Sequence, residues 1–216
     1  LVGGTILPGK PDSIYGGESS IYGRESVQAK CISSAMTHLN RRQCSEELLG
    51  GYGHSLTYEQ VKWLTDWSLV RGVNLLFPHA FFYSVRGHRR NEAPPDVGPN
   101  SPWWDGYRKY ADYCRRMCYI GTDAQHVCDV AILADSCFVP WRAARILFTY
   151  QYDSNYLEAR HLWEEAKVDT DGILLAGMHY SALIIDHVDQ PAHAGTSDQR
   201  FQFENGMNPF PERASE

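Results

Sequence analysis

The sequence predicts an α/β fold in which helices alternate with parallel strands, and two observations carry that prediction. Apolar residues recur at helical spacing in the segments 27–39, 57–70 and 107–118. Short strand-like runs lie between these segments at 43–47 and 73–78, and the second is a continuous apolar run bounded by Gly and Pro. Such a run is typical of a strand buried on both faces, as in a parallel sheet covered by helices. The alternation of helices and strands is the order of an α/β domain.

The ends of the second predicted helix carry their own signals. Thr57 followed three residues later by Gln60 resembles a capping box, in which two side chains satisfy the first free backbone groups of a helix. Arg71 supplies a cation near the C-terminus, and Gly72 supplies the residue that tolerates a left-handed turn there. The helix is therefore predicted to start after Thr57 and to end before Gly72.

A second α/β pattern begins after a linker at 121–127. It comprises, in order, a strand at 129–134, helices at 141–150 and 155–166, and strands at 172–176 and 180–186. We therefore place a domain boundary near residue 122, with a first unit at 1–122 and a second at 123–190. Residues 1–25, rich in Gly, Ser, Tyr and Pro, are expected to form a loop. Residues 191–216 are polar and aperiodic, so we expect a loose tail.

Composition excludes several function classes. The chain has 216 residues, 43% hydrophobic content and a formal net charge of -6, and its basic residues are scattered. Nucleic-acid binding needs a clustered basic surface, so it is not expected. No apolar run approaches the length of a membrane span, and we expect no membrane partner. The six cysteines form no dense framework and are expected to be reduced thiols. Cys114 and Cys118, four residues apart, are interpreted as small buried residues rather than half of a metal site.

Two adjacent carboxylates, Glu46 and Glu47, lead directly into the glycine-rich turn at 50–53. Side chains alternate along a strand, so these two point to opposite faces and only one can face a substrate. Glycines after the strand let the backbone bend over a concave site. Taken alone, such a pair is more typical of solvated acids at a loop edge. Its position at a strand end favours function, with Glu47 as the catalytic candidate and Glu46 as a structural residue.

His79 lies at the carboxyl end of the 73–78 strand, as Glu47 lies at the carboxyl end of the 43–47 strand. The carboxyl ends of parallel strands lie at one edge of the sheet, and in an eight-stranded β/α barrel they form the active site. His79 therefore either binds a substrate hydroxyl or orients Glu47; alternatively it is a buried histidine that satisfies loop backbone. The long polar segment at 86–102 that follows is typical of a functional or a disordered loop.

Ordered phrases along residues 28–186 resemble barrel glycoside hydrolases, specifically enzymes similar to family 106 α-L-rhamnosidases and related bacterial glycosidases. The phrases are Ser33-Ser34-Ala35 through His38, Ser45-Glu46-Glu47 with Gly50-Gly51-Tyr52-Gly53, Arg71-Gly72-Val73-Asn74, Phe77-Pro78-His79 with Tyr83-Ser84, and Trp103-Trp104 before a helix rich in Tyr and Arg. The resemblance implies that residues 1–122 are the C-terminal strands and helices of a TIM-type β/α barrel. A partial flavodoxin-like or amidotransferase-like α/β domain would follow.

The same resemblance implies hydrolysis of terminal O-glycosidic bonds in oligo- or polysaccharides by a carboxylate pair. Glu47 would be the general base of an inverting reaction, and a nucleophile's role in a retaining enzyme stays open. The implied substrate-binding residues are His79, Tyr83, Arg86, Trp103, Trp104, Tyr52 and His54. Trp103 and Trp104 have a second interpretation as anchors of the last barrel helix. Calcium is implied by the resemblance alone, and no loop in the chain nominates a metal site or another cofactor.

A barrel of this class needs about 250 residues, and no second catalytic carboxylate precedes the helix at 27–39. We therefore expect a fragment with little hydrolytic activity, whose partners are a carbohydrate and the remainder of a parent barrel. A bacterial cytoplasmic or periplasmic enzyme is expected, and the oligomeric state stays open. The alternative function is a noncatalytic carbohydrate-binding or assembly protein that keeps the barrel framework. A nucleotide-binding role for residues 129–186 is weaker, since no glycine-rich phosphate loop follows the first strand.

Overall fold

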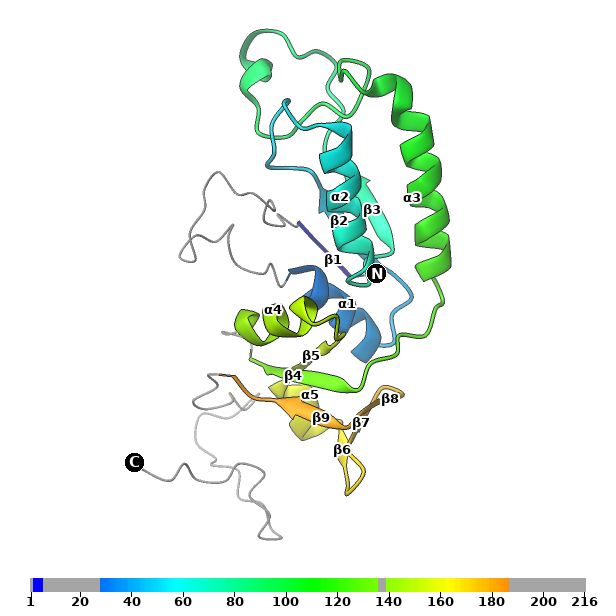
Figure 1. The fold of residues 1–216 in the computed structure, drawn as a ribbon, viewed down its shortest axis with the longest axis vertical. Coiled ribbons are helices and arrows are strands. Elements are labelled where there is room, and N and C mark those ends of the chain that lie inside the picture. The colour runs from blue at the N-terminus through cyan, green and yellow to red at the C-terminus, as the bar shows by residue number, and fades with distance from the viewer. Residues whose placement is uncertain (1, 6–27, 136–138, 187–216) are drawn as a thin grey trace, which may run out of the picture.

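The computed structural model describes residues 2–5, 28–135 and 139–186, which form two three-stranded parallel sheets and one small antiparallel sheet (Figure 1). The first sheet contains β1 (Val2–Thr5), β2 (Cys44–Leu48) and β3 (Leu75–Pro78), and its spatial order is the chain order. Both strand pairs are parallel. The α/β class with parallel strands is thus confirmed, and the described residues form no closed barrel.

Helices α1 (Gln28–His38) and α2 (Tyr58–Leu69) connect the three strands, and α3 (Tyr107–Gly121) follows the third. The predicted capping box starts α2, since Thr57 Oγ1 accepts from the Gln60 N–H and the Gln60 side chain accepts from the Thr57 N–H. Gly72, at φ +94°, makes the left-handed turn after α2. These helix limits agree with the sequence-based ones because caps are set by neighbouring residues.

Two expectations for the first sheet are wrong. Residues 1–25 were expected to be loop, but Val2–Thr5 pairs with β2, an interaction that no local pattern reveals; residues 6–25 lie outside the described chain. The 73–78 strand was expected to be buried on both faces. Leu76 packs under the helices, whereas Phe77 on the opposite face is 52% exposed. The reason is that the helices packed against β3 lie on the Leu76 face.

The second parallel sheet has the order β5-β4-β9, with β4 (Val130–Ala134) in the centre. Its residues Ala131, Ile132 and Leu133 are fully buried, as expected of a strand covered on both faces. The predicted helix at 155–166 is wrong in its first part. Asn155–Glu158 forms β5, parallel to β4, and the helix α5 is limited to Ala159–Glu164. Tertiary pairing overrides the helical periodicity there.

The remaining strands and helices complete the second unit. Helix α4 (Trp141–Thr149) connects β4 to β5, and β6 (Lys167–Val168), β7 (Ile173–Leu175) and β8 (Met178–Tyr180) form an antiparallel sheet. The predicted strand at 180–186 is divided between β8 and β9 (Ala182–Ile184). Ala176 and Gly177 both have positive φ, the conformation of a tight hairpin turn, so the chain reverses directly after β7. The expected loose tail lies outside the described residues.

Helix α1 packs against both parallel sheets. On one side Ala29 contacts Cys44 and Val73, and on another Ser34 Oγ accepts from the Tyr156 N–H of β5 at 2.9 Å. His38 lies 2.6 Å from the Tyr180 hydroxyl, which is also buried. The domain boundary near residue 122 stays a prediction, since this helix of the first unit is also part of the second sheet's packing. No helix in the described residues is long and apolar enough to cross a membrane.

Candidate functional site

The carboxyl ends of β2 and β3 open into two loops, 49–57 and 79–103, at the upper end of the molecule in Figure 1. Leu49 begins the first loop with φ +78°, a conformation that costs a branched residue about 1 kcal/mol or more. Its side chain is fully buried, and that packing holds the turn in place. The chain therefore reverses at once after β2, and the glycines that follow lie across the strand ends.

Glu47 and His79 both lie next to Gly50, at the same edge of the sheet, as the parallel arrangement of their strands predicts. A Cβ atom placed on Gly50 would lie 3.4 Å from His79 Cδ2 and 3.6 Å from Glu47 Oε1. The His79 N–H donates to the Leu48 carbonyl oxygen at 2.8 Å, which ties the two strand ends together. Both side chains are partly exposed. A Cβ atom at Gly50 would make ordinary van der Waals contacts with both side chains, so Gly50 marks the place where the carboxylate and the imidazole come near each other.

His54 joins the two loops through its ring nitrogens. The Asp96 N–H donates to His54 Nδ1 at 3.1 Å, so Nε2 carries the ring proton and donates to the Arg89 carbonyl oxygen at 3.0 Å. The ring also contacts Phe82 edge-on. Both nitrogens of this predicted substrate-binding residue are therefore used to hold the second loop, and His54 acts on the site by positioning that loop.

Asp96 is a buried acid at the centre of the second loop that sequence reasoning did not select. Its carboxylate accepts hydrogen bonds from the backbone N–H groups of Phe82, Gly98 and Asn100 at 2.9–3.0 Å. Burial raises the pKa of Asp96, but these donors outweigh that effect and hold it below its usual value. The charged side chain therefore orders the loop. The signal in the sequence was Asp two residues before Gly, within a segment rich in Pro, Gly and Asn, which are residues that favour turns.

Aromatic rings line the second loop where it meets α3. Trp104 stacks on Tyr107 with 5.1 Å between ring centroids, and Phe81 contacts both rings edge-on. Phe81 is 55% exposed and Trp104 is 36% exposed, so this aromatic cluster (Phe81, Trp104 and Tyr107) presents a flat apolar surface to solvent. Trp103 is different, because its Nε1–H donates to the Leu56 carbonyl oxygen at 3.2 Å and its ring packs on the core.

The other predicted binding residues differ in how far their side chains are exposed to solvent. Tyr83 is fully exposed and Arg86 is exposed, and both follow the strand that ends in Pro78. Tyr52 is partly buried and packs against the core beneath the first loop. The structure therefore brings Glu47 and His79 together, uses His54 and Trp103 as anchors, and leaves Trp104, Tyr83 and Arg86 at the surface.

Glu46 is fully buried on the opposite face of β2, between the sheet and α2. Neither of its carboxyl oxygens has a hydrogen-bond partner among the described residues. Burial raises the pKa of Glu46 to about 8, and the nearby Ser68 hydroxyl donates to the Leu64 carbonyl oxygen and not to the carboxyl group. Glu46 is therefore protonated at neutral pH and is not exposed to a substrate on the Glu47 face.

The described residues contain free cysteines and no cluster of metal-binding side chains. Cys31, Cys44, Cys114, Cys118 and Cys128 are free thiols, and burial raises the pKa of each. The described residues contain no group of three His, Cys, Asp or Glu side chains placed to hold a metal ion. Cys137 lies outside the described residues.

Comparisons of the chain with protein-family models, with curated proteins and with solved structures find no match.

Proposed function

We propose that this chain carries part of a glycoside hydrolase active site, with Glu47 as one of the two carboxylates. The observation that supports the proposal most is the meeting of Glu47 and His79 beside Gly50, at the carboxyl ends of adjacent parallel strands. In β/α barrels those strand ends form the active site. Three parallel strands in chain order, joined by helices, are compatible with an arc of such a barrel.

In this proposal the half-exposed Glu47 carboxylate activates water for attack on the anomeric carbon, or attacks that carbon itself in a retaining enzyme. His79 lies close enough to the same space to orient the carboxylate or to bind a sugar hydroxyl. The aromatic cluster of the second loop offers the flat surface on which a sugar ring or an aglycone packs. Substrate identity, α-L-rhamnosides first, rests on the sequence resemblance.

Two buried acids of the first unit, Asp96 and Glu46, are unsuited to be the second catalytic carboxylate. Asp96 is held by three backbone N–H groups, and Glu46 lies on the helix-covered face of the sheet. Neither can protonate a leaving group bound next to Glu47. The proposal therefore requires a different carboxyl group about 5–10 Å from Glu47, which is the range that glycosidases use.

The decisive test is Glu47→Gln, made in a protein that also supplies the second carboxylate and assayed on a panel of aryl glycosides with aryl α-L-rhamnosides included. We expect kcat to fall at least about a hundredfold, while substrate binding is retained, because general acid–base groups contribute about 10²–10⁴. Glu59→Gln, an exposed acid in the first turn of α2, is the matched control and should leave kcat unchanged. Full activity in the Glu47→Gln variant would rule out the catalytic assignment.

The aromatic cluster supports a second candidate, a noncatalytic carbohydrate-binding protein. The 36% exposed Trp104, stacked on Tyr107, is a surface of the kind that sugars stack on without any reaction. That candidate predicts saturable binding of a glycan with no turnover, lost in Trp104→Ala and retained in Glu47→Gln. Turnover that depends on Glu47 would exclude it.

A further inference from the structure

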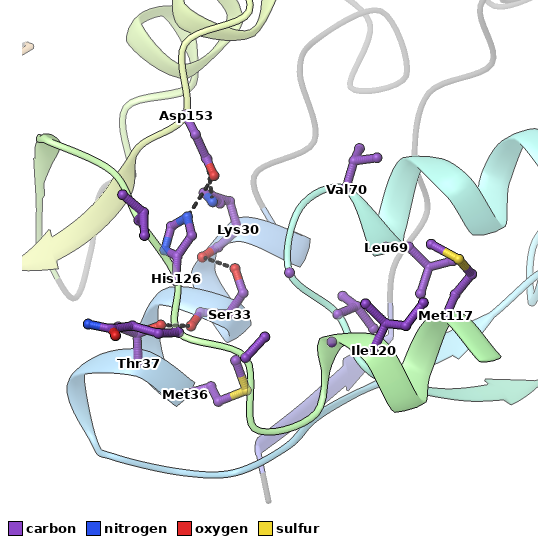
Figure 2. A pocket seen from close by; sticks show the side chains of 16 residues that line it. Lys30, Ser33, Met36, Thr37, Leu69, Val70, Met117, Ile120, His126 and Asp153 are labelled. Carbon is purple, nitrogen blue, oxygen red and sulfur yellow. Dashed lines mark hydrogen bonds and ion pairs between the residues drawn. The ribbon is translucent and has the colours of Figure 1, made fainter. Parts of the chain in front are cut away.

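A pocket of about 420 Å³ lies at the other end of the first sheet, where helix ends meet the linker at 121–127 (Figure 2). Leu69 and Val70 come from the end of α2, and Met117 and Ile120 from the end of α3. The volume is within the range of about 300–1,000 Å³ that small-molecule sites occupy. The pocket includes Gly72 and Val73, before β3, whereas His79 follows β3, so the pocket is separate from the Glu47 region.

One wall of this pocket is polar and combines a buried cation with a half-buried anion. Lys30 Nζ lies 2.6 Å from Asp153 Oδ1, and the lysine side chain is 3% exposed. His126 Nε2 lies 2.6 Å from Asp153 Oδ2, and its Nδ1 is 3.2 Å from the Asn155 side-chain nitrogen. Nδ1 therefore accepts from that amide, and Nε2 carries the proton that is donated to Asp153.

This polar wall retains unused hydrogen-bonding capacity. An ammonium group has three N–H donors, and within the described chain Asp153 is the side-chain partner of Lys30. Asp153 stays ionised, because its hydrogen bond with His126 and the charge of Lys30 outweigh burial and hold its pKa well below the usual value. Lys30 lines the pocket although its side chain is 3% exposed, so only a small part of the ammonium reaches the space, beside the more exposed Asp153 carboxylate. The Lys30–Asp153 pair has no net charge.

These features select the chemistry of the ligand's polar group. A bound anion would be attracted by Lys30 but repelled by Asp153 beside it. A bound cation would be attracted by Asp153 but repelled by Lys30. Like charges in contact at a partly buried site repel each other, and that repulsion weakens binding. An uncharged group that both donates and accepts, such as a hydroxyl or a primary amide, fits both partners at once.

The remaining walls select the body of the ligand. Met36, Leu69, Val73 and Met117 contribute apolar surface, and thioethers make favourable contacts with aromatic rings. Figure 2 shows Met36 near Thr37 on α1 and Met117 beside Leu69 and Ile120, so the two methionines come from different walls of the pocket. The apolar walls disfavour a sugar, which carries hydroxyl groups on most of its carbons.

We propose that this pocket binds an uncharged aromatic small molecule whose single hydroxyl or amide group bonds Lys30 and Asp153. The bound molecule contacts α1, α2, α3 and the linker together, so its binding stabilises the packing of the two units. The proposal does not depend on the carbohydrate function.

The test uses 2-naphthol as the probe, titrated into the 216-residue chain and followed by naphthol fluorescence and by amide chemical shifts. We expect saturable binding with shifts at Lys30, Val70 and His126. Naphthalene-2-carboxylate and 2-naphthylmethylammonium, with the same rings and opposite charges, should each bind at least tenfold more weakly, since a hydrogen bond to a charged group is worth about a tenfold change or more. This comparison needs no variant.

Lys30→Met should weaken 2-naphthol binding at least tenfold, and Lys62→Met, an exposed lysine on α2 outside the pocket, should leave it unchanged. Equal binding of the three naphthyl compounds, or shifts that lie outside the pocket, would overturn the proposal. Failure here leaves the Glu47 proposal untouched, since that proposal is tested by glycoside turnover.

Discussion

Replacing Glu46 by Gln should remove a large pH dependence of stability. The carboxyl group is fully buried, neither oxygen has a partner in the described chain, and burial raises its pKa from 4.5 to about 8. Gln has nearly the same shape and cannot ionise. The variant therefore isolates the free energy of keeping one carboxyl group protonated in the core.

The sign follows from proton linkage. Below pH 4.5 both the folded and the unfolded states keep the proton, so Glu46 contributes no pH-dependent cost. Between pH 4.5 and 8 the unfolded chain ionises while the folded chain does not, and stability falls by about 1.4 kcal/mol per pH unit. Above pH 8 the loss is complete. Its full size is at most about 5 kcal/mol, since local relaxation and water entry reduce it.

The assay is urea unfolding followed by tryptophan fluorescence between pH 4.5 and 8.5 for the wild type and for Glu46→Gln. Other titrating groups are common to both proteins, so their contributions cancel in the difference. We expect similar stability at pH 4.5 and a variant that is more stable by several kcal/mol at pH 8. Glu47→Gln removes a partly exposed carboxyl group from the opposite face of the same strand and is the matched control. Parallel curves for Glu46→Gln and the wild type would refute the reasoning.

Two further predictions concern the turns that hold the helices and the site loop. In the urea titration, Gly72→Ala should destabilise the chain by about 1–3 kcal/mol, because φ is +94° and the added Cβ would lie 2.8 Å from Ser33 Cβ. Gly87→Ala is the control: φ is +62° there and the space is open, so the cost should be about 1 kcal/mol or less. His54→Phe should accelerate proteolysis within residues 86–102, because the Asp96 N–H loses its acceptor, while the unfolding midpoint changes little. Unchanged cleavage in that variant would show that His54 does not hold the loop.

Local sequence signals determined the limits of helix α2 and the edge of the sheet at which the candidate site lies. The Thr57–Gln60 capping box and the Gly72 turn depend on neighbouring residues, so the limits of α2 were predictable. Glu47 lies near the carboxyl end of β2 and His79 directly follows the adjacent parallel strand β3, and that geometry alone brings them to one edge of the sheet. Alternation along β2 also showed that Glu46 and Glu47 point in opposite directions.

Only the tertiary structure decided which faces are covered and which distant groups meet. Helices pack on one face of the first sheet, so Glu46 became a buried neutral acid and Phe77 became exposed. Pairing with β4 turned Asn155–Glu158 into a strand despite its helical periodicity. Likewise, Lys30 and Asp153 form their ion pair because α1 packs against β5, and no pattern within either segment encodes that contact. Backbone periodicity is local, whereas burial and ion pairing depend on which segments pack together.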